Sequence, residues 1–159
     1  MKTSPEKPAE GPNRAPRNQQ PRLVGFLCMN GSQVFYDVSN PARRKLPAGF
    51  TGIAVECISQ VHAREIFKAL RFGAEGVLLA ASPQCPCGHD ENEIRQHVAE
   101  LYRALAGYDI EASRLRLEWI STAEEHKFLQ TVNEMMLGLQ QLPPLQLFKE
   151  LGRNLAYCG

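Results

Sequence analysis

The stretch that most constrains the fold is a short apolar run that ends abruptly in a cysteine-rich loop. Val77–Ala81 contains only apolar residues, and Ser82-Pro83 and then Cys85-Pro86-Cys87 follow it directly. An apolar run of this length, bounded by glycine and proline, predicts a strand that is buried on both faces. In a parallel sheet the carboxyl end of a strand is where ligands bind, and two thiols follow this strand.

Three other segments predict strands. They are residues 23–28, residues 51–57 and residues 115–120. Polar and apolar residues alternate in the last of these, which predicts a strand at a sheet edge with one face in water.

Segments with the apolar periodicity of helices lie between the predicted strands. Helices are expected at about residues 61–72 and residues 92–106, and a third is expected to start at Ser121–Glu125 with a capping-box pattern and to stop at Pro143. Residues 33–38 are compatible with a short helix or with a strand. Strands alternating with helices predict an α/β fold, here a small three-layer flavodoxin-like or Rossmann-like parallel sheet of four to five strands.

Composition narrows the class of protein. With 159 residues and a net charge of +1, the chain is expected to form one domain without a general attraction to nucleic acid. Residues 1–22 are rich in proline and polar residues and predict a disordered tail, residues 23–142 the α/β domain, and residues 143–159 a C-terminal extension. No apolar run is long enough to span a membrane, and the amino terminus lacks a signal-peptide core, so we expect a cytoplasmic protein.

Cysteines follow the ends of three predicted strands. They are Cys28, Cys57 and the pair Cys85 and Cys87. Because the carboxyl ends of parallel strands lie at one edge of a sheet, these four thiols are candidates for a single metal site. Four thiolates suit zinc or an iron–sulfur cluster. The alternative is that Cys28 and Cys57 are small buried residues at strand ends.

Other chemistry has weaker support in the sequence. His89 is the histidine beside the thiols, and either a ligand or a surface residue is compatible with its position. Cys87 precedes a predicted helix, whose amino-terminal end would lower the pKa of a thiol, so a thiol enzyme or redox sensor stays open. Neither a dinucleotide-binding nor a P-loop glycine pattern occurs in the sequence.

Two blocks resemble the delta subunit of methyl-viologen-reducing hydrogenase. The first is residues 69–80, ALRFGAEGVLLA, which lead into the cysteine-rich loop. The second is residues 114–121, RLRLEWIS, followed by a glutamate-rich helix start and Lys127-Phe128. With the segments that end in Cys28 and Cys57, the resemblance covers roughly residues 23–140.

This resemblance implies an electron-transfer subunit that carries a 2Fe-2S cluster and has no substrate chemistry of its own. The implied partners are a hydrogenase or other dehydrogenase module and a flavin-containing heterodisulfide-reductase-like subunit. By position, Cys28, Cys57 and Cys87 match cysteines of the family.

The chain departs from the family pattern at two positions. Gly31 and Ser82 stand where the family commonly has cysteines, while Cys85 has no obvious counterpart. If a cluster is kept, Cys28, Cys57, Cys85 and Cys87 form the expected ligand set. The alternatives are a docking subunit that has lost its cluster, and an interaction domain stabilised by zinc.

Overall fold

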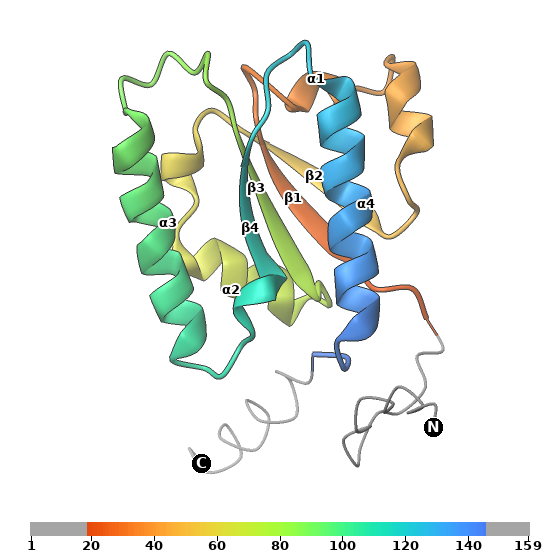
Figure 1. Cartoon of the computed structure of the whole chain (residues 1–159), viewed down its shortest axis with the longest axis vertical. Coiled ribbons are helices and arrows are strands. Elements are labelled where there is room, and N and C mark those ends of the chain that lie inside the picture. Colours follow the sequence, from red (N-terminus) through yellow and green to blue (C-terminus); the bar gives the residue numbers. More distant parts are fainter. Residues whose placement is uncertain (1–18, 146–159) are drawn as a thin grey trace, which may run out of the picture.

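A sheet of four parallel strands forms the centre of the protein in the computed structural model, which describes residues 19–145. Helical layers cover both of its faces (Figure 1). The strands are β1 (Leu23–Cys28), β2 (Phe50–Val55), β3 (Gly76–Ala81) and β4 (Leu115–Trp119). They are arranged in the order β2-β1-β3-β4. This order corresponds to the first four strands of a flavodoxin-like doubly wound sheet, so the predicted fold class is confirmed.

Strand β3 connects the two halves of the core. All six of its residues are buried, and it pairs with β1 on one side and β4 on the other. Because successive side chains of a strand point to opposite faces, Val77 and Leu79 enter one apolar layer, whereas Leu78 and Ala80 enter the other. The prediction of a strand buried on both faces is confirmed.

Helices on the two faces complete the layers. One face is covered by α2 (Ala63–Arg71) and α3 (Glu91–Ala106), and the other by the single turn α1 (Gln33–Tyr36) and by α4 (Glu125–Gln141) (Figure 1). Short 3-10 helices occupy three connections: η1 (Pro41–Lys45), η2 (Ile58–Gln60) and η3 (Ala112–Arg114). In the order β2-β1-β3-β4, the chain passes from one face of the sheet to the other between β1 and β3. The carboxyl ends of these two strands lie beside that point.

The predicted end of the second strand differs from the structure. Strand β2 ends at Val55, so Cys57 lies beyond it and precedes η2. Helix α4 begins at Glu125, within the predicted start; before it, the Glu124 N–H donates to the Ser121 carbonyl in a turn, and the Glu124 carboxylate accepts the Ser121 N–H. The ambiguous residues 33–38 contain the helical turn α1.

The ends of the chain are only partly described. Most of the predicted tail, the extension after residue 145 and Cys158 lie outside the described residues. Within the tail, the carbonyl of Arg22 accepts the N–H of Glu75 at 2.8 Å, so contacts with the sheet begin before β1. No helix among residues 19–145 is both long and apolar enough to cross a membrane.

The buried Arg114 joins the amino-terminal edge of the sheet to the end of α4. Its side chain is 1% exposed and pairs with Glu111 at 2.6 Å. The same guanidinium donates to the backbone carbonyls of Glu75, at 2.9 Å, and of Pro143, at 2.6 Å. A buried guanidinium with partners for its donors fixes these three segments relative to one another.

Replacing Arg114 is therefore expected to destabilise the fold. Arg114→Met leaves the two carbonyls without their donor and should lower the free energy of unfolding by about 2–4 kcal/mol. The matched control is Arg95→Met on α3, because Arg95 and its partner Glu91 are both exposed; we expect a change within about 0.5 kcal/mol. Urea unfolding measures both, and equal midpoints for the two variants would contradict this role of Arg114.

Candidate metal centre

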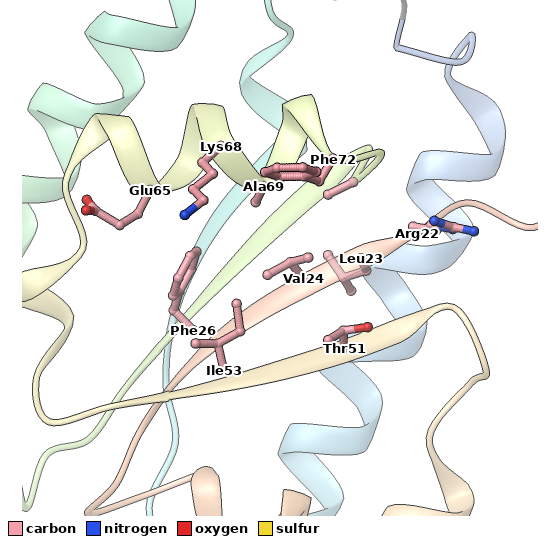
Figure 2. A pocket seen from close by; sticks show the side chains of 11 residues that line it. Arg22, Leu23, Val24, Phe26, Thr51, Ile53, Glu65, Lys68, Ala69 and Phe72 are labelled. Atoms are coloured by element: carbon pink, nitrogen blue, oxygen red, sulfur yellow. The ribbon is translucent and has the colours of Figure 1, made fainter.

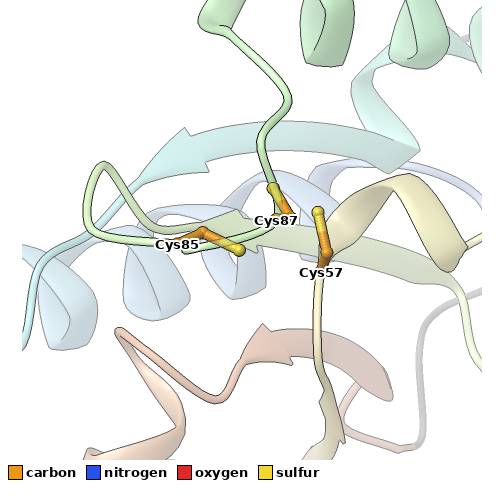
Figure 3. A group of neighbouring side chains, drawn as sticks. All are labelled: Cys57, Cys85 and Cys87. Atoms are coloured by element: carbon orange, nitrogen blue, oxygen red, sulfur yellow. The ribbon is translucent and has the colours of Figure 1, made fainter.

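Three cysteine sulfurs meet at the carboxyl edge of the sheet (Figure 3). Cys57 follows β2, while Cys85 and Cys87 lie in the loop between β3 and α3. Their Sγ atoms all lie within 4.8 Å of one another. Segments that are distant in the sequence thus place three soft ligand atoms at one point.

The loop that carries two of the thiols is held at its start by Ser82. The Ser82 hydroxyl donates to the carbonyl oxygen of Asn30 at 2.7 Å and accepts the N–H of Gln84 at 3.1 Å. The N–H of Cys85 in turn donates to the Ser82 carbonyl at 3.3 Å. These bonds tie the loop after β3 to the loop after β1 and turn Cys85 back toward the sheet edge.

Cys28 lies next to the three gathered sulfurs without being one of them. Its side chain is 1% exposed, and its thiol donates to the carbonyl oxygen of Glu56 at 3.4 Å. The Cys85 thiol is directed at the same oxygen at 3.5 Å. Of the four thiols singled out in the sequence, the structure therefore brings three together and places Cys28 as their buried neighbour.

The sulfurs of Cys85 and Cys57 differ in their hydrogen bonds and in the effect of burial. Burial raises the pKa of the Cys85 thiol above its ordinary value, and hydrogen bonds with Cys87 partly offset this rise. The Cys57 sulfur accepts a hydrogen bond from the Ser59 hydroxyl at 3.1 Å. Sequence reasoning missed Ser59, although its spacing from Cys57 across the first turn of η2 is a signal that could have identified it.

An open cavity of about 530 Å³ gives access to the thiols. All three cysteines line it, together with Met29, Asn30, Glu56, Ser59, Gln60, Pro86 and His89. Cys57 is buried, whereas Cys85 and Cys87 are half-buried. The group is thus reached from solvent on one side and covered by the core on the other.

The two positions at which the family resemblance leads one to expect cysteines are in contact. A Cβ atom on Gly31 would lie 2.9 Å from the Cβ of Ser82 and 2.5 Å from the carbonyl oxygen of Ile120. The backbone at Gly31 therefore leaves no space for a side chain unless the end of β4 moves. At this point the loop after β1 lies directly against the start of the loop after β3.

The arrangement suits a thiophilic metal. Tetrahedral coordination with metal–sulfur bonds of about 2.3 Å places neighbouring sulfurs about 3.8 Å apart, which is within the 4.8 Å limit of this group. Thiolates select zinc and iron–sulfur centres over hard cations. Three ligands leave one position of a four-coordinate centre to be filled.

A second hollow, of about 400 Å³, lies between α2 and the strands β1 and β2 (Figure 2). Its walls are mainly apolar, with Val24, Phe26 and Ile53 on the strands, and Arg22 and Lys68 also line it. None of the residues that line it is a cysteine or a histidine. It therefore offers no ligands for a soft metal.

Comparison with known proteins identifies a family and several relatives. The model of the family described as "Methyl-viologen-reducing hydrogenase, delta subunit" matches residues 23–143. An iron-sulfur subunit of the F420-non-reducing hydrogenase vhc of Methanococcus voltae is 28% identical over 86% of this chain and 96% of its own length. The similarly named hydrogenase protein of Archaeoglobus profundus is 27% identical over 80% of this chain and 94% of its own length.

Other relatives are much longer than this chain. One belongs to the ferredoxin/F420H2-dependent CoB-CoM heterodisulfide reductase of Methanosarcina acetivorans; it is 29% identical over 82% of this chain, but the match covers 17% of that protein. For the corresponding ferredoxin:CoB-CoM heterodisulfide reductase protein of Methanosarcina mazei the values are 28%, 91% and 18%. This chain thus spans less than a fifth of the length of these two proteins.

The close approach at Gly31 predicts opposite effects for two glycine substitutions. Gly31→Ala should destabilise the protein by about 1–3 kcal/mol, because the new Cβ overlaps a backbone oxygen that cannot move without shifting β4. Gly138→Ala is the matched control, since its Cβ would enter open space on α4; we expect a gain of about 0.5–1 kcal/mol. Thermal and urea unfolding distinguish the two variants. A Gly31→Ala variant as stable as the unchanged protein would contradict the close approach of Gly31 to the Ile120 carbonyl oxygen.

Proposed function

The chain belongs to the methyl-viologen-reducing hydrogenase delta subunit family, and we propose that it is an iron–sulfur electron-transfer subunit of a larger oxidoreductase. The observation that carries this proposal is the group formed by Cys57, Cys85 and Cys87. The described part of the chain supplies metal ligands at an open edge. Its own role would be to hold a redox centre between the cofactors of its partners.

The names and lengths of the relatives indicate the class of partner. A region similar to this chain forms nearly all of the two hydrogenase iron-sulfur subunits, but it is one segment of the two longer heterodisulfide reductase proteins. Segments of one polypeptide remain close together in the folded protein. A separate chain that is similar to such a segment would therefore be expected to bind a heterodisulfide-reductase-like protein. We therefore propose that it connects a hydrogenase or other dehydrogenase module with a flavin-containing heterodisulfide-reductase-like subunit.

The gathered sulfurs are compatible with an iron–sulfur centre, for which we propose the 2Fe-2S type. When bound, such a centre would supply reversible uptake of one electron. Cys57, Cys85 and Cys87 would hold it, with Cys28 as a buried neighbouring thiol. The Ser59 hydroxyl would favour the reduced, more negative form, because it already donates to the Cys57 sulfur. The half-buried Cys85 and Cys87 would bring the centre close to the docking partner.

One observation favours a second candidate, a single zinc ion with a structural role. Sulfur separations that do not exceed 4.8 Å are close to those around one tetrahedral ion. In that case the metal would stabilise the loops at the sheet edge, and the chain would serve as a docking subunit. Metal analysis separates the two candidates.

Iron and acid-labile sulfide should be present in equal amounts in protein purified without oxygen. The double variant Cys85→Ser/Cys87→Ser removes two of the three gathered sulfurs, so it should lose the iron, the sulfide and the visible absorption. The matched control is Cys158→Ser, because the proposal gives Cys158 no part in the metal centre.

The metal content also decides between the candidates. Bound zinc without sulfide would support the structural site and contradict the electron-transfer role. A double variant that kept its full metal content would contradict both.

Metal affinity is expected to increase with pH. Because burial raises the pKa of the Cys85 thiol, this group is protonated at neutral pH, and a metal ion must displace its proton. Each thiol proton released raises the affinity by up to about tenfold for each pH unit. Zinc titrations across neutral pH, with calorimetry in two buffers to count the protons, measure the effect. An affinity that does not change with pH would contradict thiolate coordination.

A further inference from the structure

The fourth position of the metal centre needs one more side chain. A structural zinc ion and a whole 2Fe-2S cluster are each held by four protein ligands, and three sulfurs are gathered here. The candidates near them are Cys28 and the side chains that line the cavity.

Cys28 is poorly placed to be that ligand. Unlike Cys85, it is not among the residues that line the cavity, and the residue is only 1% exposed. A metal that binds from the cavity would reach Cys28 only if this buried residue moved toward it. Movement of a residue in β1 would disturb the pairing of that strand with β2.

His89 is placed on the open side, in the same cavity as the three thiols. We infer that His89 is the fourth ligand, giving a site of three cysteines and one histidine made from Cys57, Cys85, Cys87 and His89. This inference rests on the metal centre proposed above. Three cysteines and one histidine form an established type of zinc site, and histidine also replaces cysteine in some iron–sulfur centres.

The hydrogen bond on the other side of the imidazole supports this role. The Nδ1 atom of His89 lies 3.3 Å from the Oε2 atom of Glu93. Metal-binding histidines characteristically donate their second ring N–H to a carboxylate, which fixes the tautomer and aims the other nitrogen at the metal. Here that arrangement leaves Nε2 of His89 for the metal.

Glu93 is itself held in place by the start of α3. Its carboxylate also accepts the N–H of Asp90 at 3.0 Å, while the Asp90 side chain accepts the N–H of Glu93 at 2.8 Å. This reciprocal capping box orients the carboxylate that contacts His89. The first turn of α3 thus serves as an outer support for the proposed ligand.

The backbone before His89 provides the freedom that ligation needs. The ring nitrogens of His89 are not part of the 4.8 Å group, so the ring must move toward the sulfurs when a metal binds. Gly88 has a φ of +79° and no atom within 4 Å of a Cβ built there. A glycine in open space between Cys87 and His89 allows that movement without displacing the core.

The other histidines among the described residues do not compete for this position. His62 and His97 form an edge-to-face pair, and His97 is also bonded to the carbonyl of Val61. His126 lies on α4, which covers the opposite face of the sheet. None of these three lines the thiol cavity.

A neutral imidazole in place of a fourth thiolate makes the centre less negative by one charge. In an iron–sulfur centre this change raises the reduction potential relative to four cysteines, because the added electron meets less repulsion. The identity of the fourth ligand would therefore affect the reduction potential, and with it the direction of electron flow, as well as how tightly the metal is held.

Titration with cobalt(II) alone tests the inference on the full-length, reduced chain without oxygen. Cobalt(II) reports sulfur and nitrogen ligands through its visible spectrum. His89→Ala should weaken cobalt binding by more than about 10-fold, since even the loss of a group that only orients a ligand costs about 10- to 100-fold. His89→Cys should restore tight binding with a spectrum of four sulfurs. His126→Ala, the matched control, and Cys28→Ser should bind as the unchanged chain does.

A spectroscopic measurement gives an independent readout. In the zinc-loaded chain, ¹⁵N chemical shifts should identify one histidine, lost in His89→Ala, with Nε2 bound to the metal and Nδ1 protonated. Circular dichroism establishes that each variant is folded.

The outcomes separate the role of His89 from the existence of the metal centre. A chain that binds cobalt tightly but loses binding in Cys28→Ser and not in His89→Ala would overturn the role of His89 and leave the metal centre intact. A chain that binds neither cobalt, zinc nor iron would overturn the metal centre and the inference together.

Discussion

The burial of β3 on both faces is the constraint on which the rest of the structure depends. This strand pairs with β1 and β4 and supplies side chains to both apolar layers. Its position makes the sheet doubly wound, since helices must cover each face. Its end at Ala81 sends the chain into the loop that carries Cys85 and Cys87. The core and two of the three sulfurs of the proposed metal centre therefore depend on one run of apolar residues.

Much of this organisation is predictable because it depends on local patterns. Apolar runs and helical periodicity identify the strands and three of the helices, and the parallel sheet follows from their alternation. The three cysteine-bearing loops are predictable for the same reason. The positions of Gly31, Ser82 and Cys85 also lead one, by resemblance to the family, to expect a changed ligand set in this chain.

The arrangement of the sulfurs is not predictable from those patterns. Whether Cys28 joins the group depends on the direction of its side chain at the end of β1 and on its bond to the Glu56 carbonyl. The roles of Ser59 and Glu93 depend on hydrogen bonds in short turns. The contact between Gly31 and Ser82 joins loops far apart in the sequence, so it exists only in the folded chain.

Placed at an open edge, the proposed centre combines rigid support with access. The Ser82 bonds and the capping box of α3 fix the two ends of the loop, while its middle stays exposed to the cavity. Such a site can hold a metal near the surface without opening the core. This property suits the proposed exchange of electrons with a partner that would dock at this loop.

X-ray absorption at the edge of the bound metal would examine this coordination without any substitution. For a single zinc ion we predict three sulfur atoms at about 2.3 Å and one nitrogen atom at about 2.0 Å. For an iron centre with bridging sulfide, an additional iron neighbour and sulfide sulfurs should accompany the nitrogen. Coordination by nitrogen and oxygen atoms alone would contradict a metal centre on Cys57, Cys85 and Cys87.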